Sequence, residues 1–393
     1  MKTVAIIAEF NPFHNGHEYI IKKAKELTKA DNVIVIMSGE FTQQGNIAIM
    51  DKFQRAEIAI SHGADLVLEL PTIYATSCAE TFAKGAISIL NSLNIVDYIA
   101  FGTECEDITI LKSIAQKSID NNVALNNIIK ENLKDGYSYA KSKANALAKI
   151  LTENEYKHIA NPNNILAIEY LKNLILLNSS IKPIAIKRIS ANHNDQSVSL
   201  NSIFSSATSI RQCVQRGEIE SISPYVPKET YKNLTCPIFN DDLYLLIRFL
   251  ILNSNSLDLK NIYEVSEGLE HKIENSVLTS KTYTELLNNI KSKRYTMSRI
   301  KRILVHILLD ITCNQYGLLK DVKYARVLKI KSKDILSKLS KKSTIHIISN
   351  INNNSISKLD KNILLSLNLD FKAENIYSII TNSNLNKDKT NKI

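Results

Sequence analysis

Two histidines three positions apart stand where a strand pattern gives way to a helix pattern. His14-Asn15-Gly16-His17 follows an apolar run over residues 4–8 and precedes residues that recur at helical spacing. With one ring in the loop and the other in the first helical turn, both can donate to one phosphate beside the positive end of the helix dipole. Such donors would stabilise the charge that builds on an α-phosphate under attack. A helix cap or a satisfied core pair is the alternative, which the strand before Asn11-Pro12-Phe13 disfavours.

A hydroxyl-rich segment further along could bind the rest of a triphosphate. Residues 205–211 read Ser-Ser-Ala-Thr-Ser-Ile-Arg, with hydroxyls at a helix start and the cation of Arg211 one turn inside. Such a segment suits β- and γ-phosphates. A plain N-cap explains the hydroxyls equally well on their own, so the segment gains weight only beside the HxGH pattern.

Several other polar residues have both an ordinary and a functional explanation. Arg188 ends a predicted strand and is either a solvated charge or a ligand of the nucleotide. Residues 161–164, Asn-Pro-Asn-Asn, indicate a turn and an N-cap. His193 is a loop histidine or an acid/base candidate. Asp51-Lys52 and Arg55 are interpreted as surface charges at a helix start.

A dense basic cluster lies in the second half of the chain. Residues 291–295 read Lys-Ser-Lys-Arg-Tyr, and Arg299, Lys301 and Arg302 follow before an apolar stretch at 303–309. Arginine, lysine and tyrosine together can hold RNA phosphates and stack a base. A solvated amphipathic helix is the alternative, and the local charge density favours RNA.

The apolar pattern predicts an α/β fold with a doubly wound parallel sheet. Apolar runs at residues 4–8, 33–37, 66–70, 98–101 and 181–186 read as strands, and helical patterns separate them. Ligands of such sheets bind outside the carboxyl ends of the strands, where the HxGH loop lies.

The predicted division places one domain over residues 1–215 and a second over residues 216–393. Beyond about residue 216 the strand and helix alternation ends, and lysine-rich helical patterns predict a mainly α domain. The last dozen residues, NSNLNKDKTNKI, have no apolar face and are predicted to be disordered.

The bulk composition limits the function classes. The chain has 393 residues and a formal net charge of +10, which favours an anionic partner, RNA before a membrane surface or an acidic metabolite. Its five cysteines are scattered without a CxxC pair, which disfavours a disulfide framework or a zinc site and fits a reducing cytoplasm. Neither the N-terminus nor residues 243–252 predict export or a membrane span.

Read together, several segments resemble the bacterial tRNA(Met) cytidine acetate ligase family. The likeness rests on EFNPFHNGH, MSGEFTQQG, DKFQRAEIAISHGADLVLELP, AFGTE, NPNNILAIEYL, IKR and FSSATSIRQ, and continues in KRYTMSRIKRILVHILL and YARVL. The resemblance implies a ligase that makes acetyl-adenylate from ATP and acetate. It then acetylates N4 of the wobble cytidine of elongator tRNA(Met), giving N4-acetylcytidine. ATP is thus the implied substrate, Mg²⁺ the implied metal, and the two regions would serve ATP/acetate activation and tRNA binding.

The resemblance also carries site residues over by motif. His14 and His17 would be catalytic. The ATP-binding residues would be Ile7, Ala8, Glu9, Phe10, Asn11, Pro12, Phe13, His14, Asn15, Gly16, His17, Glu18, Tyr19, Ile20, Gly102, Asn163, Arg188 and Ile189. The residues on the pyrophosphate side would be Ser206, Thr208 and Arg211, and those that bind tRNA would be Lys293, Arg294, Arg299 and Arg302. No metal ligand is identified, and the sequence after Arg188 departs from the family pattern, so no role is carried to His193.

Two other functions compete with this one. An adenylyltransferase acting on a small phosphorylated metabolite would share the HxGH pattern, but it has no need of a long basic second region. An RNA-binding protein with an inactive nucleotidyltransferase domain is the third possibility. The intact HxGH pattern beside the SSATSIR segment argues against it.

Overall fold

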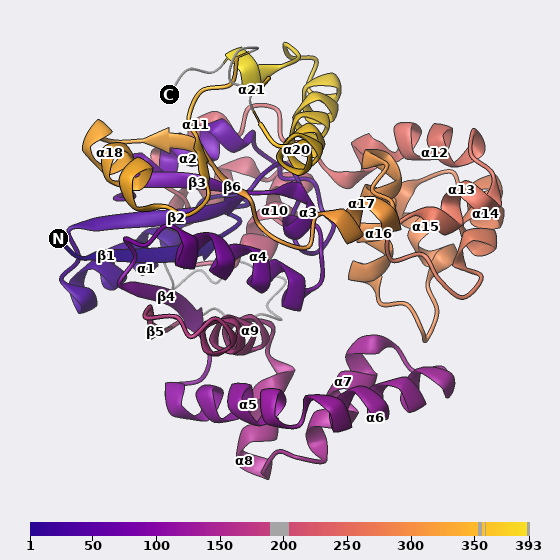
Figure 1. The fold of residues 1–393 in the computed structure, drawn as a ribbon. Helices are drawn as coiled ribbons and strands as arrows, with labels where there is room; N and C mark the ends of the chain where they lie inside the picture. Colours follow the sequence, from indigo (N-terminus) through magenta and orange to yellow (C-terminus); the bar gives the residue numbers. More distant parts are fainter. Residues whose placement is uncertain (189–203, 353–355, 358, 391–393) are drawn as a thin grey trace.

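A seven-stranded sheet forms the centre of the computed structural model, which describes all residues except 189–203, 353–355, 358 and 391–393 (Figure 1). Within the described residues the strand order is β5-β4-β1-β2-β3-β6-β7. The strands are β1 (Thr3–Ala8), β2 (Asn32–Ser38), β3 (Leu66–Leu70), β4 (Tyr98–Thr103), β5 (Lys182–Lys187), β6 (Tyr324–Ile330) and β7 (His346–Ile348). Neighbouring strands are parallel except β3 and β6, which pair antiparallel.

Helices cover both faces of the sheet, which explains why its strands are apolar throughout. Side chains of β1, β2 and β3 alternate between two core clusters, so both faces of each strand are buried. On one face lie α3 (Thr72–Ala75), α4 (Ala79–Ser92) and α9 (Pro162–Leu176), and on the other lie α1 (Asn15–Thr28), α2 (Lys52–Ser61) and α10 (Ala207–Gln215). The predicted doubly wound sheet is confirmed.

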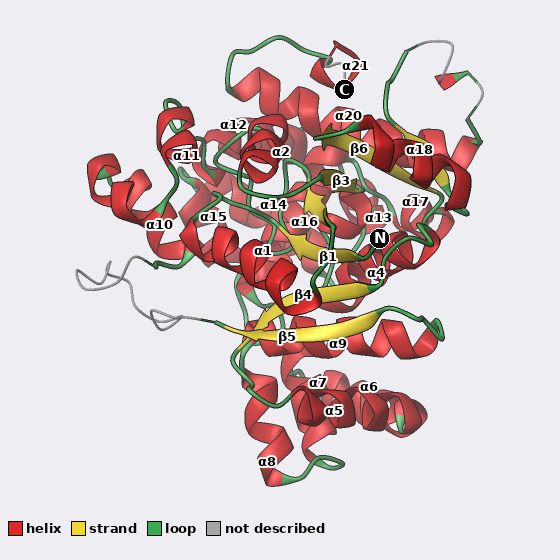
Figure 2. Ribbon diagram, turned by 90° about the vertical axis from the view of Figure 1, so that its left-hand side faces the viewer, coloured by secondary structure: helices red, strands yellow, loops and turns green. Residues whose placement is uncertain are grey.

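A helical insertion separates β4 from β5, as the sequence predicts for this stretch. It consists of α5 (Ile108–Asp120), α6 (Asn122–Lys134), α7 (Tyr139–Ala148), α8 (Glu153–Tyr156) and the short 3-10 helix η1 (Lys157–Ala160), followed by α9. In both ribbon views α9 lies along the sheet near β5, while α5–α8 extend away from it (Figures 1 and 2).

The region after residue 216 contributes helices and also two strands. Its helical elements are η2 (Ile219–Tyr225), α11 (Lys228–Asn233), η3 (Asn240–Leu243), α12 (Tyr244–Leu252), α13 (Ser256–Asn261), α14 (Leu269–Thr279), α15 (Tyr283–Ile290), α16 (Met297–Leu309), α17 (Cys313–Leu318), α18 (Lys333–Lys342), α20 (Lys361–Ile380) and α21 (Lys387–Thr390). The expected helical character is present, but β6 and β7 extend the first region's sheet beyond β3. The chain therefore returns to the sheet, and the domain division at residue 215 stays a prediction.

Charged residues in this fold occupy unexpected positions. The interpretation of Lys52 and Arg55 as surface charges is wrong, because both side chains are fully buried. The Arg55 guanidinium donates to backbone carbonyls at the ends of β1 and β2, including that of Glu9 at 2.7 Å. Arg55 thereby holds together the two strand ends that border the HxGH loop.

Part of the C-terminal tail, for which the sequence predicts disorder, forms a short helix with one buried carboxylate. Residues 387–390 form α21, and Asp388 is only 2% exposed. The Asp388 carboxylate lies 2.9 Å from Lys52 Nζ and 2.8 Å from an Arg326 guanidinium nitrogen, so the tail packs against α2 and β6. Among the described residues, none of the helices has the length and apolar character needed to span a membrane.

A candidate nucleotide-binding active site

The histidine pair lies where β1 ends and α1 begins. His14 is the N-cap of α1, and its Nδ1 accepts the backbone N–H of Gly16 at 3.0 Å. His17 Nδ1 in turn accepts the backbone N–H of His14 at 3.2 Å, and the two rings stack with centroids 3.7 Å apart. Since each Nδ1 accepts a hydrogen bond, the remaining proton of each neutral ring is on Nε2. Capping the helix and binding a phosphate are therefore compatible roles for these histidines, because the capping hydrogen bonds at Nδ1 fix the direction of the Nε2–H donors.

Both rings are held in the neutral form. Burial, together with the nearby Arg188 cation, lowers the pKa of His14 to about 3 and that of His17 well below its usual range. At neutral pH each ring presents an Nε2–H donor without a positive charge. Donors with a fixed direction require no reorganisation when charge develops on a bound phosphate.

Gly16 has a steric role in this arrangement. A Cβ at residue 16 would lie 2.8 Å from His14 Cε1, closer than such atoms approach each other. The glycine therefore allows the His14 ring to fold back over the helix start. The reason for a glycine at this position is thus the space that the His14 ring occupies.

Two arginines border the histidine pair. Arg211 donates to the backbone carbonyl of Asn11 at 2.6 Å and to Thr208 Oγ1 at 3.2 Å, which places α10 beside the HxGH loop. Arg188 reaches Asn163 Oδ1 at 3.4 Å. Burial lowers the pKa of both arginines, yet guanidinium remains charged in proteins, so both supply positive charge for phosphates.

Ser206 performs the capping role that the sequence offers as the ordinary explanation. Its Oγ accepts the backbone N–H of Ser209 at 3.0 Å at the start of α10. Both Ser206 and Thr208 also line the cavity described below, so capping and ligand binding are compatible here too.

A cavity of about 830 Å³ brings most of the predicted nucleotide residues together. Those that line it are Ile7, Ala8, Glu9, Phe10, Asn11, His14, His17, Ile20, Gly102, Asn163, Arg188, Ser206, Thr208 and Arg211. The predicted residues that support the loop without lining the cavity are Pro12, Phe13, Asn15, Gly16, Glu18 and Tyr19. Ile189 and His193 lie outside the described residues. The cavity thus lies at the carboxyl edge of the sheet, as expected for this fold.

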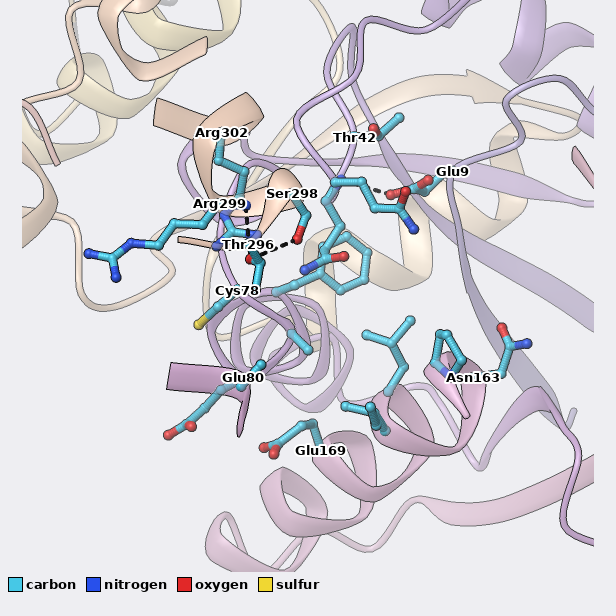
Figure 3. Close-up of a pocket in the computed structure, with 18 of the residues that line it drawn as sticks. Glu9, Thr42, Cys78, Glu80, Asn163, Glu169, Thr296, Ser298, Arg299 and Arg302 are labelled. Atoms are coloured by element: carbon cyan, nitrogen blue, oxygen red, sulfur yellow. Dashed lines mark hydrogen bonds between the residues drawn. The ribbon is translucent and has the colours of Figure 1, made fainter. Parts of the chain in front are cut away.

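The carboxylate of Glu9 lines the cavity beside the phosphate site. The sequence indicated Glu9 only as one residue of the nucleotide-binding motif. Glu9 lines the cavity (Figure 3), and its Oε1 accepts the backbone N–H of Gln43 at 2.8 Å. Burial raises the pKa of Glu9, while Gln43 and the cations of Arg211 and Arg55 oppose that effect. Thr42, Gln43 and neighbouring residues of the β2–α2 loop complete this wall. Thr42 and Gln43 belong to the MSGEFTQQG segment of the resemblance, which assigned no role to either residue.

The basic cluster of the second region takes several different positions. Arg294 lines the cavity and pairs with Glu267 at 3.0 Å, while Lys293 is exposed and outside it. Arg299 donates to Ser266 and its guanidinium carbon lies 5.0 Å from the centre of the Tyr295 ring.

Arg302, also predicted to bind tRNA, lines the cavity but lies in a different environment from Arg294. This side chain is only 6% exposed, and it makes two hydrogen bonds of 3.0 Å with the carboxylate of Glu264. Glu264 neutralises the guanidinium, so a role of Arg302 in tRNA binding stays a prediction. The ion pair holds α16 against the segment before α14.

Within the described residues, no group of three or more His, Cys, Asp or Glu side chains is placed to hold a metal ion. The predicted Mg²⁺ therefore has no protein ligand set in this part of the chain. It stays a prediction, and nothing in the following chemistry depends on it.

The fold and the neutral histidine pair define a nucleotidyl transferase of the HIGH type, and the family model for HIGH nucleotidyl transferases matches residues 1–392. A tRNA(Met) cytidine acetate ligase of Clostridium perfringens is 41% identical over 396 residues, which is 98% of this chain and 96% of that protein. One from a Thermoanaerobacter species is 40% identical and covers 89% of each chain. The chain belongs to the tRNA(Met) cytidine acetate ligase family.

Solved structures agree with this assignment. The apo structure of Thermotoga maritima TmcAL superimposes with a TM-score of 0.90 and 33% identity, covering 97% of this chain and 95% of the other. The same protein bound with alpha-thio ATP gives a TM-score of 0.88 at 32% identity, with the same coverage. The comparison supports nucleotide binding in this fold.

The histidine assignment predicts an unusual titration. The His14 ring should stay a neutral Nε2–H tautomer from about pH 8 down to about pH 5, because its pKa is lowered from about 6.5 to about 3. Nitrogen chemical shifts of the labelled imidazole would show this, whereas a midpoint near 6.5 would contradict it. On acidification the unfolded chain binds this proton first, so His14 makes the fold less stable as the pH falls from about 6.5 to about 3.

Proposed function

We propose that the protein joins acetate to ATP, forming acetyl-adenylate, and transfers the acetyl group to N4 of the wobble cytidine of elongator tRNA(Met). The observation that carries the proposal is the pair of neutral Nε2–H donors of His14 and His17 inside the cavity. The relatives named as tRNA(Met) cytidine acetate ligases and the alpha-thio ATP complex of one TmcAL support it.

In the first step an acetate oxygen attacks the α-phosphorus and pyrophosphate leaves. Negative charge grows on the non-bridging oxygens of the α-phosphate, where the histidine donors would act. The side chains of Arg211, Thr208 and Ser206 lie at the start of α10, next to the HxGH loop. We assign them to the β- and γ-phosphates and to the departing pyrophosphate.

In the second step the cytosine amine attacks the acetyl carbonyl carbon. The bond from that carbon to the phosphate oxygen breaks, AMP leaves with the bonding electrons, and N4 loses one proton to give N4-acetylcytidine. No enzyme thiol is acylated in this scheme. The proposed reaction uses ATP, acetate and tRNA, and we propose that it takes place in the cytoplasm, where these are present together.

The deciding experiment follows both steps separately. The purified protein is incubated with ATP, labelled acetate and bacterial tRNA, and the digested nucleosides are analysed for N4-acetylcytidine. Acetate-dependent exchange of labelled pyrophosphate into ATP reports the first step alone. We expect both signals. Exchange that depends on a phosphorylated metabolite instead of acetate would replace the proposal with the metabolite adenylyltransferase.

A further inference from the structure

The cavity extends well beyond the histidine pair. Its volume of about 830 Å³ lies near the upper end of the range of about 300–1,000 Å³ that ligand pockets commonly have. Figure 3 shows Cys78, Glu80 and Arg299 on the opposite side of the cavity from Glu9 and Asn163. This opposite side, which we call the distal wall, is formed by residues of α4, α6–α7, α9 after Asn163 and residues 264–302, and none of these residues is assigned to the nucleotide.

A charged cluster forms the lower part of the distal wall. Glu169 is only 2% exposed, and its carboxylate is held by Lys143 at 2.8 Å and Lys172 at 2.9 Å. Lys143 also lies 3.5 Å from Glu80, whose side chain is half exposed at the start of α4. The cavity therefore presents a lysine and a carboxylate side by side, anchored by a buried partner.

An aromatic ring stands next to this cluster. Tyr139, at the start of α7, lines the cavity and remains 41% exposed. It precedes Lys143 by four residues on the same helix, so the two side chains share one helix face. An exposed tyrosine face in a cavity wall is a surface on which a nucleobase can stack.

The cation of Arg294 lines the same cavity. The Arg294 guanidinium is 3.5 Å from the position that a Cβ on Gly136 would take, so residues 291–296 meet the α6–α7 turn there. The Arg294 side chain is 44% exposed, and its ion-pair partner Glu267 is exposed as well. Exposed pairs of this kind contribute little stability, so a phosphate can compete for the arginine.

We infer that the distal wall binds the acceptor nucleoside, an unpaired pyrimidine of an RNA loop, with Tyr139 stacking on the base, Lys143 and Glu80 on its edge, and Arg294 on its phosphate. A carboxylate accepts hydrogens from a cytosine amine, and lysine donates to the ring nitrogen and carbonyl. An in-plane hydrogen bond leaves the face of the amine open to the acetyl group. This inference rests on the proposed function and names the residues that would hold its second substrate.

Substitution of Tyr139 separates this role from nucleotide activation. Tyr139→Ala should weaken the apparent affinity for tRNA by about 5- to 150-fold, the range that loss of one stacking ring causes. Acetate-dependent pyrophosphate exchange should be unchanged. Tyr139→Phe, which keeps the stacking face, should behave like the wild type, and so should Tyr156→Ala, an exposed tyrosine of the same insertion that does not line the cavity.

A binding measurement keeps the inference independent of catalysis. An anticodon stem-loop with a wobble cytidine, labelled with a fluorophore, is titrated with wild type, Tyr139→Ala and Arg294→Ala. Both variants should bind more weakly, and the salt dependence should be smaller for Arg294→Ala. Equal binding by wild type and Tyr139→Ala, or a parallel loss of exchange in Tyr139→Ala, would overturn the inference. Absence of exchange in the wild type would instead overturn the proposed function.

Discussion

Replacement of His17 by alanine should lower acetate-dependent pyrophosphate exchange by about 100- to 1,000-fold, the usual effect of removing one donor to a developing oxyanion. The neutral ring presents its Nε2–H to the cavity, because Nδ1 accepts the backbone N–H of His14. Alanine removes that donor and an aromatic contact with Phe10. The rate of exchange at saturating ATP and acetate measures the effect.

A second substitution separates the capping role of the histidines from their catalytic role. His14→Asn retains an oxygen that can accept the Gly16 N–H, and asparagine is a favoured N-cap, but no donor reaches the position of Nε2. We expect normal thermal unfolding with exchange reduced as strongly as in His17→Ala. His271→Ala is the matched control, because this histidine is exposed on α14 and outside the cavity. Normal exchange in His14→Asn would reduce His14 to a helix cap.

Local pattern was sufficient to predict the five strands β1–β5 and the position of the histidine pair, but not β6 and β7, which join the sheet from the region after residue 216. β1, the loop after it and the start of α1 are adjacent in sequence. Hydrophobic periodicity therefore predicts the strand and the helix, and the helix dipole predicts an anion site between them. Arg211 and Arg188 were also placed near the phosphates. Their partners are Asn11, in the loop after β1, and Asn163, in the first turn of α9.

The residues that sequence reasoning misplaced have partners far away in the chain. Lys52 looks like a surface residue because nothing near it in sequence neutralises it, whereas Glu69 and Asp388 do so in the fold. Arg302 was grouped with exposed basic residues because its partner Glu264 lies on a separate segment. Tyr139 and Lys143 carried no signal, since a tyrosine and a lysine on an ordinary helix pattern resemble solvated side chains.

Replacement of Asp388 by alanine should destabilise the protein by about 3–5 kcal/mol, the usual cost of removing one partner from a buried ion pair. Asp388 contacts both Lys52 and Arg326, which are buried, and Glu69 alone would then face the two cations. Burial raises the pKa of the nearby Asp370 to about 7, so that carboxyl can ionise and replace part of the lost charge. We therefore expect a value near the lower end of the range.

Chemical denaturation of Asp388→Ala beside Asn384→Ala measures this effect, because Asn384 is an exposed residue of the same tail. Asn384→Ala should unfold like the wild type. At low temperature Asp388→Ala should keep its pyrophosphate exchange, since Lys52, Glu69, Arg326 and Asp388 do not line the cavity. The tail would then act on stability and not on catalysis. An unchanged unfolding midpoint would mean that the tail does not hold α2 and β6 together, and that water or Asp370 satisfies the two cations without it.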